Sequence, residues 1–265
     1  MAEFIDSHCH LSDPRLDPTL LQQMMSSAAE MRISRFVQGG VGPEEWQKQI
    51  ELASRFPKKV ILCLGLHPMW VADHDEEECE KALDLLAPLL PKAKALGEMG
   101  LDFRPHYRNH SEQLQVRMFE EQLELAEAAE LPAVLHLVQA HEFAIRILDV
   151  WGSPKKGGFA HSFNGSSQKA EDLMRRGFSL SVGGPVTYSN NKTLRTAVEA
   201  IPMERLLLET DAPDQPPFSK KGQLHGPASL WEIAETVGHI KALDPEEVLE
   251  ASSANVRRLL NLEKN

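Results

Sequence analysis

A repeated alternation of short apolar segments and longer amphipathic segments constrains the fold of this chain more than any other feature. Eight stretches have the length and composition of β-strands: residues 4–10, 35–40, 60–68, 93–102, 132–138, 157–163, 178–183 and 205–211. Residues 60–64 are apolar without interruption, as is typical of parallel strands that are buried on both faces.

Segments with helical periodicity separate these strands. In the clearest segment, residues 111–130, the apolar residues Leu114, Met118 and Leu123 recur among charged residues. The other helical segments are residues 18–31, 43–56, 76–90, 141–151, 166–176 and 191–200, followed after the last strand by 228–242 and 245–262. This order predicts an α/β fold, a (β/α)8 TIM barrel with an additional C-terminal helix. An open doubly wound sheet is the alternative. No linker divides the chain, so we expect a single domain over residues 1–265.

Composition narrows the classes of function. The net charge of −11 argues against a protein that binds polyanions over a broad basic surface, but it does not exclude an enzyme that meets one phosphate in a pocket. Three scattered cysteines without a CxxC pair favour a reducing, cytoplasmic location. We expect no membrane insertion, because no apolar run approaches about 18 residues.

Polar residues gather late in the predicted strands. His8 and His10 are two residues apart, so in a strand both side chains point to the same face. Taken singly, such residues have structural explanations, as a core histidine, half of an ion pair or a helix cap. Together they are costly to bury unless they are paired or bind metal, and barrel enzymes place their chemistry at this end of the strands. Four imidazoles and two carboxylates fit two ions that share a carboxylate: His8, His10, His136, His161, Glu98 and Asp211.

These residues lie in motifs that resemble, in the same order, those of the TatD family. The motifs are Asp6-Ser7-His8-Cys9-His10-Leu11, Gly65-Leu66-His67-Pro68, Gly97-Glu98-Met99-Gly100-Leu101-Asp102, Leu131-Pro132 with His136, His161-Ser162-Phe163-Asn164-Gly165-Ser166 and Glu209-Thr210-Asp211-Ala212-Pro213, together with the helical residues Gln115, Phe119, Gln122, Leu123 and Ala126. The resemblance implies a metal-dependent deoxyribonuclease on a barrel of the metal-dependent hydrolase superfamily. It also implies the metal ligands His8, His10, Glu98, His136, His161 and Asp211.

The chain departs from the family pattern at two places. Residues 137–141 lack the arginine that commonly follows the strand-five histidine, and residues 223–227 lack the asparagine that usually precedes a proline after the last strand. A basic group that could contact a phosphate is therefore missing, whereas all six implied ligands are present.

The catalytic roles follow from the order of strands in a closed barrel. We expect Glu98 to bridge two ions, one completed by His8, His10 and Asp211 and the other held by His136 and His161. Asp211 is also expected to orient or deprotonate the attacking water. Asp6 and Glu209 are expected to accept hydrogen bonds from ligating imidazoles; an internal hydrogen-bonded layer is an equal alternative for these two residues. Alternation along the strand places Cys9 opposite the histidines, facing the helices.

Substrate contacts are expected beside the ligands. His67 either donates to a phosphate oxygen or holds the turn at Pro68, and the resemblance implies that Asp102, Arg104 and Tyr107 lie on the substrate side. The irregular segment 212–227 has the length of a substrate-contacting loop. Four imidazoles favour Zn or Mn over Mg, although the resemblance points to activity with Mg.

Three functions are compatible with these residues. The first is cleavage of DNA phosphodiester bonds by metal-activated water, as an exonuclease on single-stranded ends. The second is a barrel amidohydrolase or lactonase that acts on a small carbonyl substrate; such enzymes often bridge their metals with a modified lysine on strand four, where this chain has Glu98. The third is a non-catalytic metal-binding protein. DNA is the expected partner, with neither a membrane nor an obligate protein partner.

Overall fold

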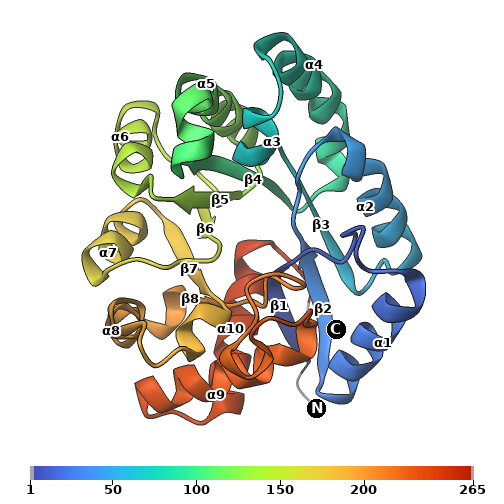
Figure 1. Cartoon of the computed structure of the whole chain (residues 1–265), viewed down its shortest axis with the longest axis vertical. Helices are drawn as coiled ribbons and strands as arrows, with labels where there is room; N and C mark the ends of the chain where they lie inside the picture. The colour runs from blue at the N-terminus through green and yellow to red at the C-terminus, as the bar shows by residue number, and fades with distance from the viewer. Residues whose placement is uncertain (1–2, 264–265) are drawn as a thin grey trace.

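Eight parallel strands form a nearly closed barrel in the computed structural model, which describes residues 3–263. The strands follow one another around the sheet in chain order (Figure 1): β1 (Phe4–Cys9), β2 (Ile33–Gln38), β3 (Val60–Leu64), β4 (Ala95–Asp102), β5 (Ala133–Val138), β6 (Gly158–Ala160), β7 (Phe178–Val182) and β8 (Leu206–Leu208). β8 also contacts β1. The predicted TIM barrel is therefore confirmed.

Helices surround the barrel (Figure 1): α1 (Pro18–Glu30), α2 (Pro43–Arg55), α3 (Pro68–Ala72), α4 (Glu76–Leu86), α5 (Pro105–Ala128), α6 (His141–Trp151), α7 (Ser167–Arg175), α8 (Lys192–Ala200), α9 (Leu230–Lys241) and α10 (Pro245–Leu259). The sequence patterns did not predict the short helix α3, and α5 begins earlier than the predicted residue 111. Both helices begin at a proline. Proline suits the first turn, because an N–H at that position would have no acceptor within the helix. The predicted helix 76–90 is shorter, because a 3-10 segment with an internal proline replaces its end.

Three predicted strands are shorter than expected. β3, β6 and β8 end at Leu64, Ala160 and Leu208, although the residues that follow are largely buried. His67, His161 and Asp211 therefore lie on loops just beyond the strand ends, where the backbone is free to turn their side chains toward the barrel axis.

The additional C-terminal helix, α10, closes the amino-terminal end of the barrel. Its residues Val256 and Leu260 pack in one cluster with the barrel-interior residues Ile5, Val37 and Leu207. The hydroxyls of Ser253 and Ser252 accept hydrogen bonds from the main-chain N–H groups of Ile5 (3.0 Å) and Leu208 (2.7 Å). With this end sealed, only the carboxyl end of the barrel is open to a substrate.

Between residues 3 and 263, no helix combines the length and apolar character needed to cross a membrane.

Candidate metal centre

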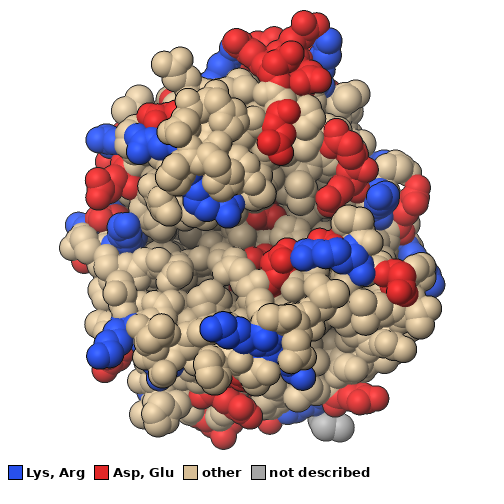
Figure 2. All heavy atoms as spheres, viewed as in Figure 1, with Lys and Arg blue, Asp and Glu red and all other residues tan. Residues whose placement is uncertain are grey.

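The polar residues predicted at the strand ends come together at the carboxyl end of the barrel. Figure 2 shows this face hollowed at its middle, with acidic atoms inside the hollow and basic side chains around it. Glu98 on β4 lies at the centre of the cluster and is 1% exposed. The residues that surround it are His8 on β1, His10 just after β1, His136 on β5, His161 after β6 and Asp211 after β8.

The two carboxylate oxygens of Glu98 face different groups of imidazoles. Its Oε1 lies 3.2 Å from Nε2 of His8 and 3.4 Å from Nε2 of His10. Its Oε2 lies 2.7 Å from Nε2 of His161 and 3.4 Å from Nδ1 of His136. One carboxylate therefore contacts imidazoles through both of its oxygens, and the two sets of imidazoles adjoin, since the ring centres of His8 and His161 lie 4.2 Å apart.

Asp211 completes the first set. Its Oδ1 lies 3.3 Å from Nε2 of His10 and 3.8 Å from Nε2 of His8. Two main-chain hydrogen bonds hold it there: the N–H of Asp211 donates to the carbonyl of His8 (2.9 Å), and the N–H of His10 donates to the carbonyl of Ala212 (2.7 Å).

The donor atoms fit divalent cations. Among residues 3–263, both ring nitrogens of His8 and Oε1 of Glu98 are buried without a hydrogen-bond partner, which is costly unless another group satisfies them. Nδ1 of His136 and Nε2 of His161 lie 2.9 Å apart, so two ring nitrogens converge on one point. Imidazole nitrogen and carboxylate oxygen are the donors that zinc and manganese accept.

A glycine leaves the space for this cluster. A Cβ atom on Gly39, which follows β2, would lie 2.7 Å from Cε1 of His8, 2.8 Å from Oε1 of Glu98 and 2.8 Å from Cε1 of His10. Real contacts of that kind are not tolerated, so only glycine allows these three side chains to meet. Sequence reasoning did not identify Gly39, because its contribution is the absence of an atom.

The electrostatics of the cluster keep its carboxylates ionised. Burial raises the pKa of Glu98, but the imidazoles of His161 and His8 lower it by a larger amount. The pKa of Glu98 therefore lies well below its usual value. Burial also raises the pKa of Asp211, which the hydrogen bond from His10 and the nearby imidazoles nevertheless hold at about 2. For His10, burial lowers the pKa, but Glu98 and Asp211 together raise it to about 9. Metal binding at this cluster must therefore displace protons.

Two carboxylates lie behind the histidines of the second set. Asp102 is buried, and its Oδ2 lies 3.4 Å from Nε2 of His136. The carboxylate of Glu209 accepts a hydrogen bond from the N–H of Ser162 (2.5 Å) and lies 3.8 Å from Nδ1 of His161. Asp102, which we expect on the substrate side, lies between His136 and Arg104 and contacts both.

Asp6 serves the framework of the centre. Its carboxylate accepts hydrogen bonds from the N–H (2.9 Å) and the hydroxyl (2.5 Å) of Thr210 and from the N–H of His8 (3.3 Å). These contacts agree with the alternative of an internal hydrogen-bonded layer. Cys9 packs in the large cluster with Met25 and Ala28 of α1.

His67 holds the turn at Pro68 and also points into the centre. Its Nδ1 accepts a hydrogen bond from the N–H of Met69 at 3.0 Å, so it caps α3. Burial and the neighbouring His136 lower the pKa of His67 well below its usual value. A neutral imidazole whose Nδ1 is an acceptor carries its proton on Nε2, and this Nε2 lies 3.1 Å from Nδ1 of His136 and 3.5 Å from Oε2 of Glu98. His67 is therefore a donor at the edge of the second set.

Arg104 and Tyr107, the other two residues expected on the substrate side, lie next to each other. The guanidinium of Arg104 donates to Asp102 at 2.9 Å and lies 5.2 Å from the centre of the Tyr107 ring. Its side chain is 39% exposed. Gln215 was not predicted: its side-chain amide donates to Asp211 (2.5 Å) and to the hydroxyl of Ser162 (2.6 Å). The only signal in the sequence is its place on the loop after β8.

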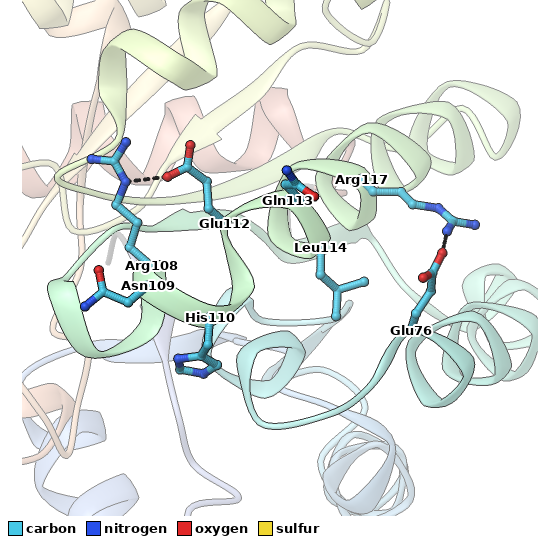
Figure 3. A pocket seen from close by; sticks show the side chains of 8 residues that line it. All are labelled: Glu76, Arg108, Asn109, His110, Glu112, Gln113, Leu114 and Arg117. Carbon is cyan, nitrogen blue, oxygen red and sulfur yellow. Dashed lines mark hydrogen bonds and ion pairs between the residues drawn. The ribbon is translucent and has the colours of Figure 1, made fainter.

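Another cavity, of about 680 Å³, lies away from this centre along α5 (Figure 3). Its charged residues pair with one another: Arg108 contacts Glu112, and Arg117 contacts Glu76. His110 bonds to the carbonyl of Ala72. These side chains are already satisfied, so this cavity has none of the convergent, unpartnered donors that mark the metal centre.

The fold and the buried donor cluster define a metal-dependent hydrolase. A family model described as TatD related DNase matches residues 5–261. The chain therefore belongs to the TatD family, and it is a hydrolase acting on ester bonds.

Individual relatives agree with this assignment. YabD of Bacillus subtilis, an uncharacterized metal-dependent hydrolase, is 32% identical over 257 residues, which cover 97% of this chain and 98% of YabD. The 3′-5′ ssDNA/RNA exonuclease TatD of Citrobacter rodentium is 31% identical over 235 residues, or 84% of this chain and 85% of that protein. The crystal structure of the TatD homolog YjjV from Escherichia coli superimposes with a TM-score of 0.88 at 28% identity and covers 98% of both chains.

Proposed function

We propose that this protein cleaves phosphodiester bonds at single-stranded ends of DNA. The observation that carries the proposal is the Glu98 carboxylate, whose two oxygens face different, adjoining pairs of imidazoles. Such an arrangement suits two divalent ions that share a ligand, as in enzymes that hydrolyse phosphodiesters. The exonuclease name of the Citrobacter relative supports the same substrate class.

The ligands divide between the two ions as the distances suggest. His8, His10 and Asp211 would hold one ion with Oε1 of Glu98, and His136 and His161 would hold the other with Oε2. When bound, such ions polarise the phosphoryl group and acidify water. We propose Zn or Mn as the bound metals, with Mg able to support activity.

The protein's own groups carry the remaining steps. Asp211, held by Gln215 through its Oδ2, orients the attacking water and accepts its proton at the carboxylate. His67 donates from Nε2 to a phosphate oxygen, a role that its tautomer permits. Arg104 places positive charge near the substrate. Asp102 keeps the ring of His136 in position.

The depth of the centre favours a single strand over a duplex. The side chains of the proposed ligands are at most 16% exposed, and the carboxyl end of the barrel is hollowed at its middle (Figure 2). A flexible strand end can enter such a hollow, whereas the backbone of a duplex is held at its rim. We also propose a cytoplasmic location, in line with three free cysteines.

An assay on metal-loaded protein tests the proposal. Labelled single-stranded DNA should be shortened stepwise from one end, duplex DNA more slowly, and a panel of lactones and amides not at all. Hydrolysis of the lactones with DNA left intact would overturn the nuclease proposal and favour the carbonyl-directed alternative. Glu98→Ala protein serves as the control for contaminating nucleases.

A further inference from the structure

A groove lies directly beside the metal centre, next to the loops that follow β6, β7 and β8. It has a volume of about 550 Å³ and is lined by Asn164, Pro185, Tyr188, Asn190, Asn191, Gln215 and Pro216. We refer to these residues as the Tyr188 groove. Gln215 connects it to the centre, because the same side chain bonds to Asp211 at 2.5 Å. A molecule in the groove therefore lies next to the scissile bond.

Tyr188 lines the groove, and Phe218 packs against its ring. The Tyr188 hydroxyl donates to the carbonyl of Pro216 at 3.2 Å, and its ring meets the Phe218 ring edge to face at 5.6 Å. Phe218 is 62% exposed. Its main-chain N–H nevertheless donates to the hydroxyl of Thr187 at 2.8 Å, so the exposed ring is held on a fixed backbone. Fixed aromatic surfaces of this kind are used to stack nucleic-acid bases.

The polar lining is partly fixed and partly exposed. Asn191 accepts from the N–H of Leu194 (3.4 Å) and donates to Oδ1 of Asn164 (3.0 Å). Asn190 is exposed. An amide offers both donors and an acceptor, which match the edge of a base.

The charge of the groove suits an anionic strand. None of its lining residues is acidic, in a chain whose net charge is −11. Lys220 and Lys221 follow Phe218 and are exposed. A phosphodiester backbone that runs from the metal centre along the Tyr188 groove therefore meets no carboxylate among the lining residues.

We propose that the Tyr188 groove binds the nucleoside joined to the scissile phosphate, with its base against Tyr188 and Phe218. This inference rests on the proposed nuclease activity and assigns its substrate subsite. The volume of the groove is within the range of small-ligand sites, about 300–1,000 Å³.

The test compares esters that differ only in the nucleoside. With Mn-loaded protein, kcat/KM is measured for thymidine 5′-(4-nitrophenyl phosphate), for its 3′ isomer and for methyl 4-nitrophenyl phosphate, which has no base. The preference is the ratio of the better thymidine ester to the methyl ester. Phe218→Ala and Tyr188→Ala should each lower this ratio by about 5- to 100-fold, the range of base stacking.

Three controls isolate the stacking contact. Tyr188→Phe keeps the ring and should keep the preference. Trp151→Ala removes another exposed aromatic, 48% exposed at the end of α6, and should change no rate constant. Hydrolysis of the methyl ester and metal content, measured in each preparation, show that the variants fold. An unchanged preference in both alanine variants would overturn the groove assignment while leaving the nuclease proposal intact.

A second readout covers failure of the nuclease proposal. If the wild-type protein hydrolyses none of the esters, binding of a fluorescein-labelled oligothymidylate is compared with that of an abasic strand by anisotropy. The groove assignment is supported if the wild-type protein binds the oligothymidylate more tightly than the abasic strand and Phe218→Ala removes this difference. Equal binding of both strands refutes it.

Discussion

The Gly39→Ala substitution tests whether the donor cluster is assembled as described. The new Cβ would lie 2.7–2.8 Å from atoms of His8, Glu98 and His10. Carbon contacts are most favourable at about 3.5–4.0 Å, so these three atoms must move away by roughly 0.7 Å or more. Metal–ligand distances tolerate only about ±0.2 Å. We expect metal affinity to fall about 100-fold and kcat to fall with it, since a misplacement of about 1 Å can cost 10²-fold.

In the metal-free protein the same overlap should lower the free energy of unfolding by about 1–3 kcal/mol, because the three side chains lie equally close there. The backbone at Gly39 lies outside the left-handed region, so alanine is allowed there and reduces the freedom of the unfolded chain by about 0.4–1 kcal/mol. The added stability from bound metal should fall by about 2.7 kcal/mol, the equivalent of a 100-fold weaker affinity. Thermal unfolding with and without a chelator, together with calorimetric metal titration, measures both quantities.

Gly42→Ala is the matched control. Its Cβ would lie 2.5 Å from Cδ1 of Trp70, a comparable overlap that involves no residue of the centre. It should leave metal affinity unchanged. Gly39→Ala protein that binds metal with wild-type affinity and turns over at the wild-type rate would refute the described packing around Glu98.

Further substitutions separate the roles of individual residues. Glu98→Ala should weaken both ions because it removes the shared ligand; elemental analysis that finds both retained at full affinity would disprove the bridge. Asp211→Asn should lower kcat by about 10²–10⁴-fold with little change in KM, measured on preparations of known metal content. Cys9→Ala should leave activity nearly unchanged, since Cys9 packs toward the helices; a loss like that of a ligating histidine would mean an inverted register. Acid should destabilise the fold through His141, because burial and Lys169 lower its pKa from 6.5 to about 4. The unfolded chain then binds the proton more readily, so the free energy of unfolding declines by up to about 3 kcal/mol between pH 6.5 and about 4. When the free energy of unfolding of His141→Gln is measured with urea at several pH values, this part of the decline should be absent.

Hydrophobic periodicity predicted the fold, because the apolar runs of strands and the amphipathic pattern of helices are both local in the sequence. The apolar run at Val60–Leu64 and the amphipathic stretch within Pro105–Ala128 need no knowledge of distant residues. The strand ends were overestimated because buried residues continue past them, as Leu66 does after β3. Helix α3 was missed because five residues are too few to show a helical period.

The contacts around the ligands were not predictable in the same way. Ser162, Asp211 and Gln215 all have positive φ angles, which turn their side chains in directions that strand alternation does not give. The bond between Gln215 and Ser162 joins residues 53 positions apart. No single-sequence pattern encodes such a pair. Residue chemistry at the strand ends could identify the proposed ligands, but not the groups that hold them.

Closure of the barrel and assembly of the first ligand set depend on the same hydrogen bonds. β8 has only three residues, and the residues that follow it are joined to the β1 segment by bonds from the N–H of Asp211 to the carbonyl of His8 and from the N–H of His10 to that of Ala212. The Asp6 carboxylate adds two bonds to Thr210 at the same seam. These bonds bring Asp211 beside both histidines of β1. The contacts of Asp6 agree with the internal hydrogen-bonded layer that was one of its two expected roles, and they help to position a proposed ligand.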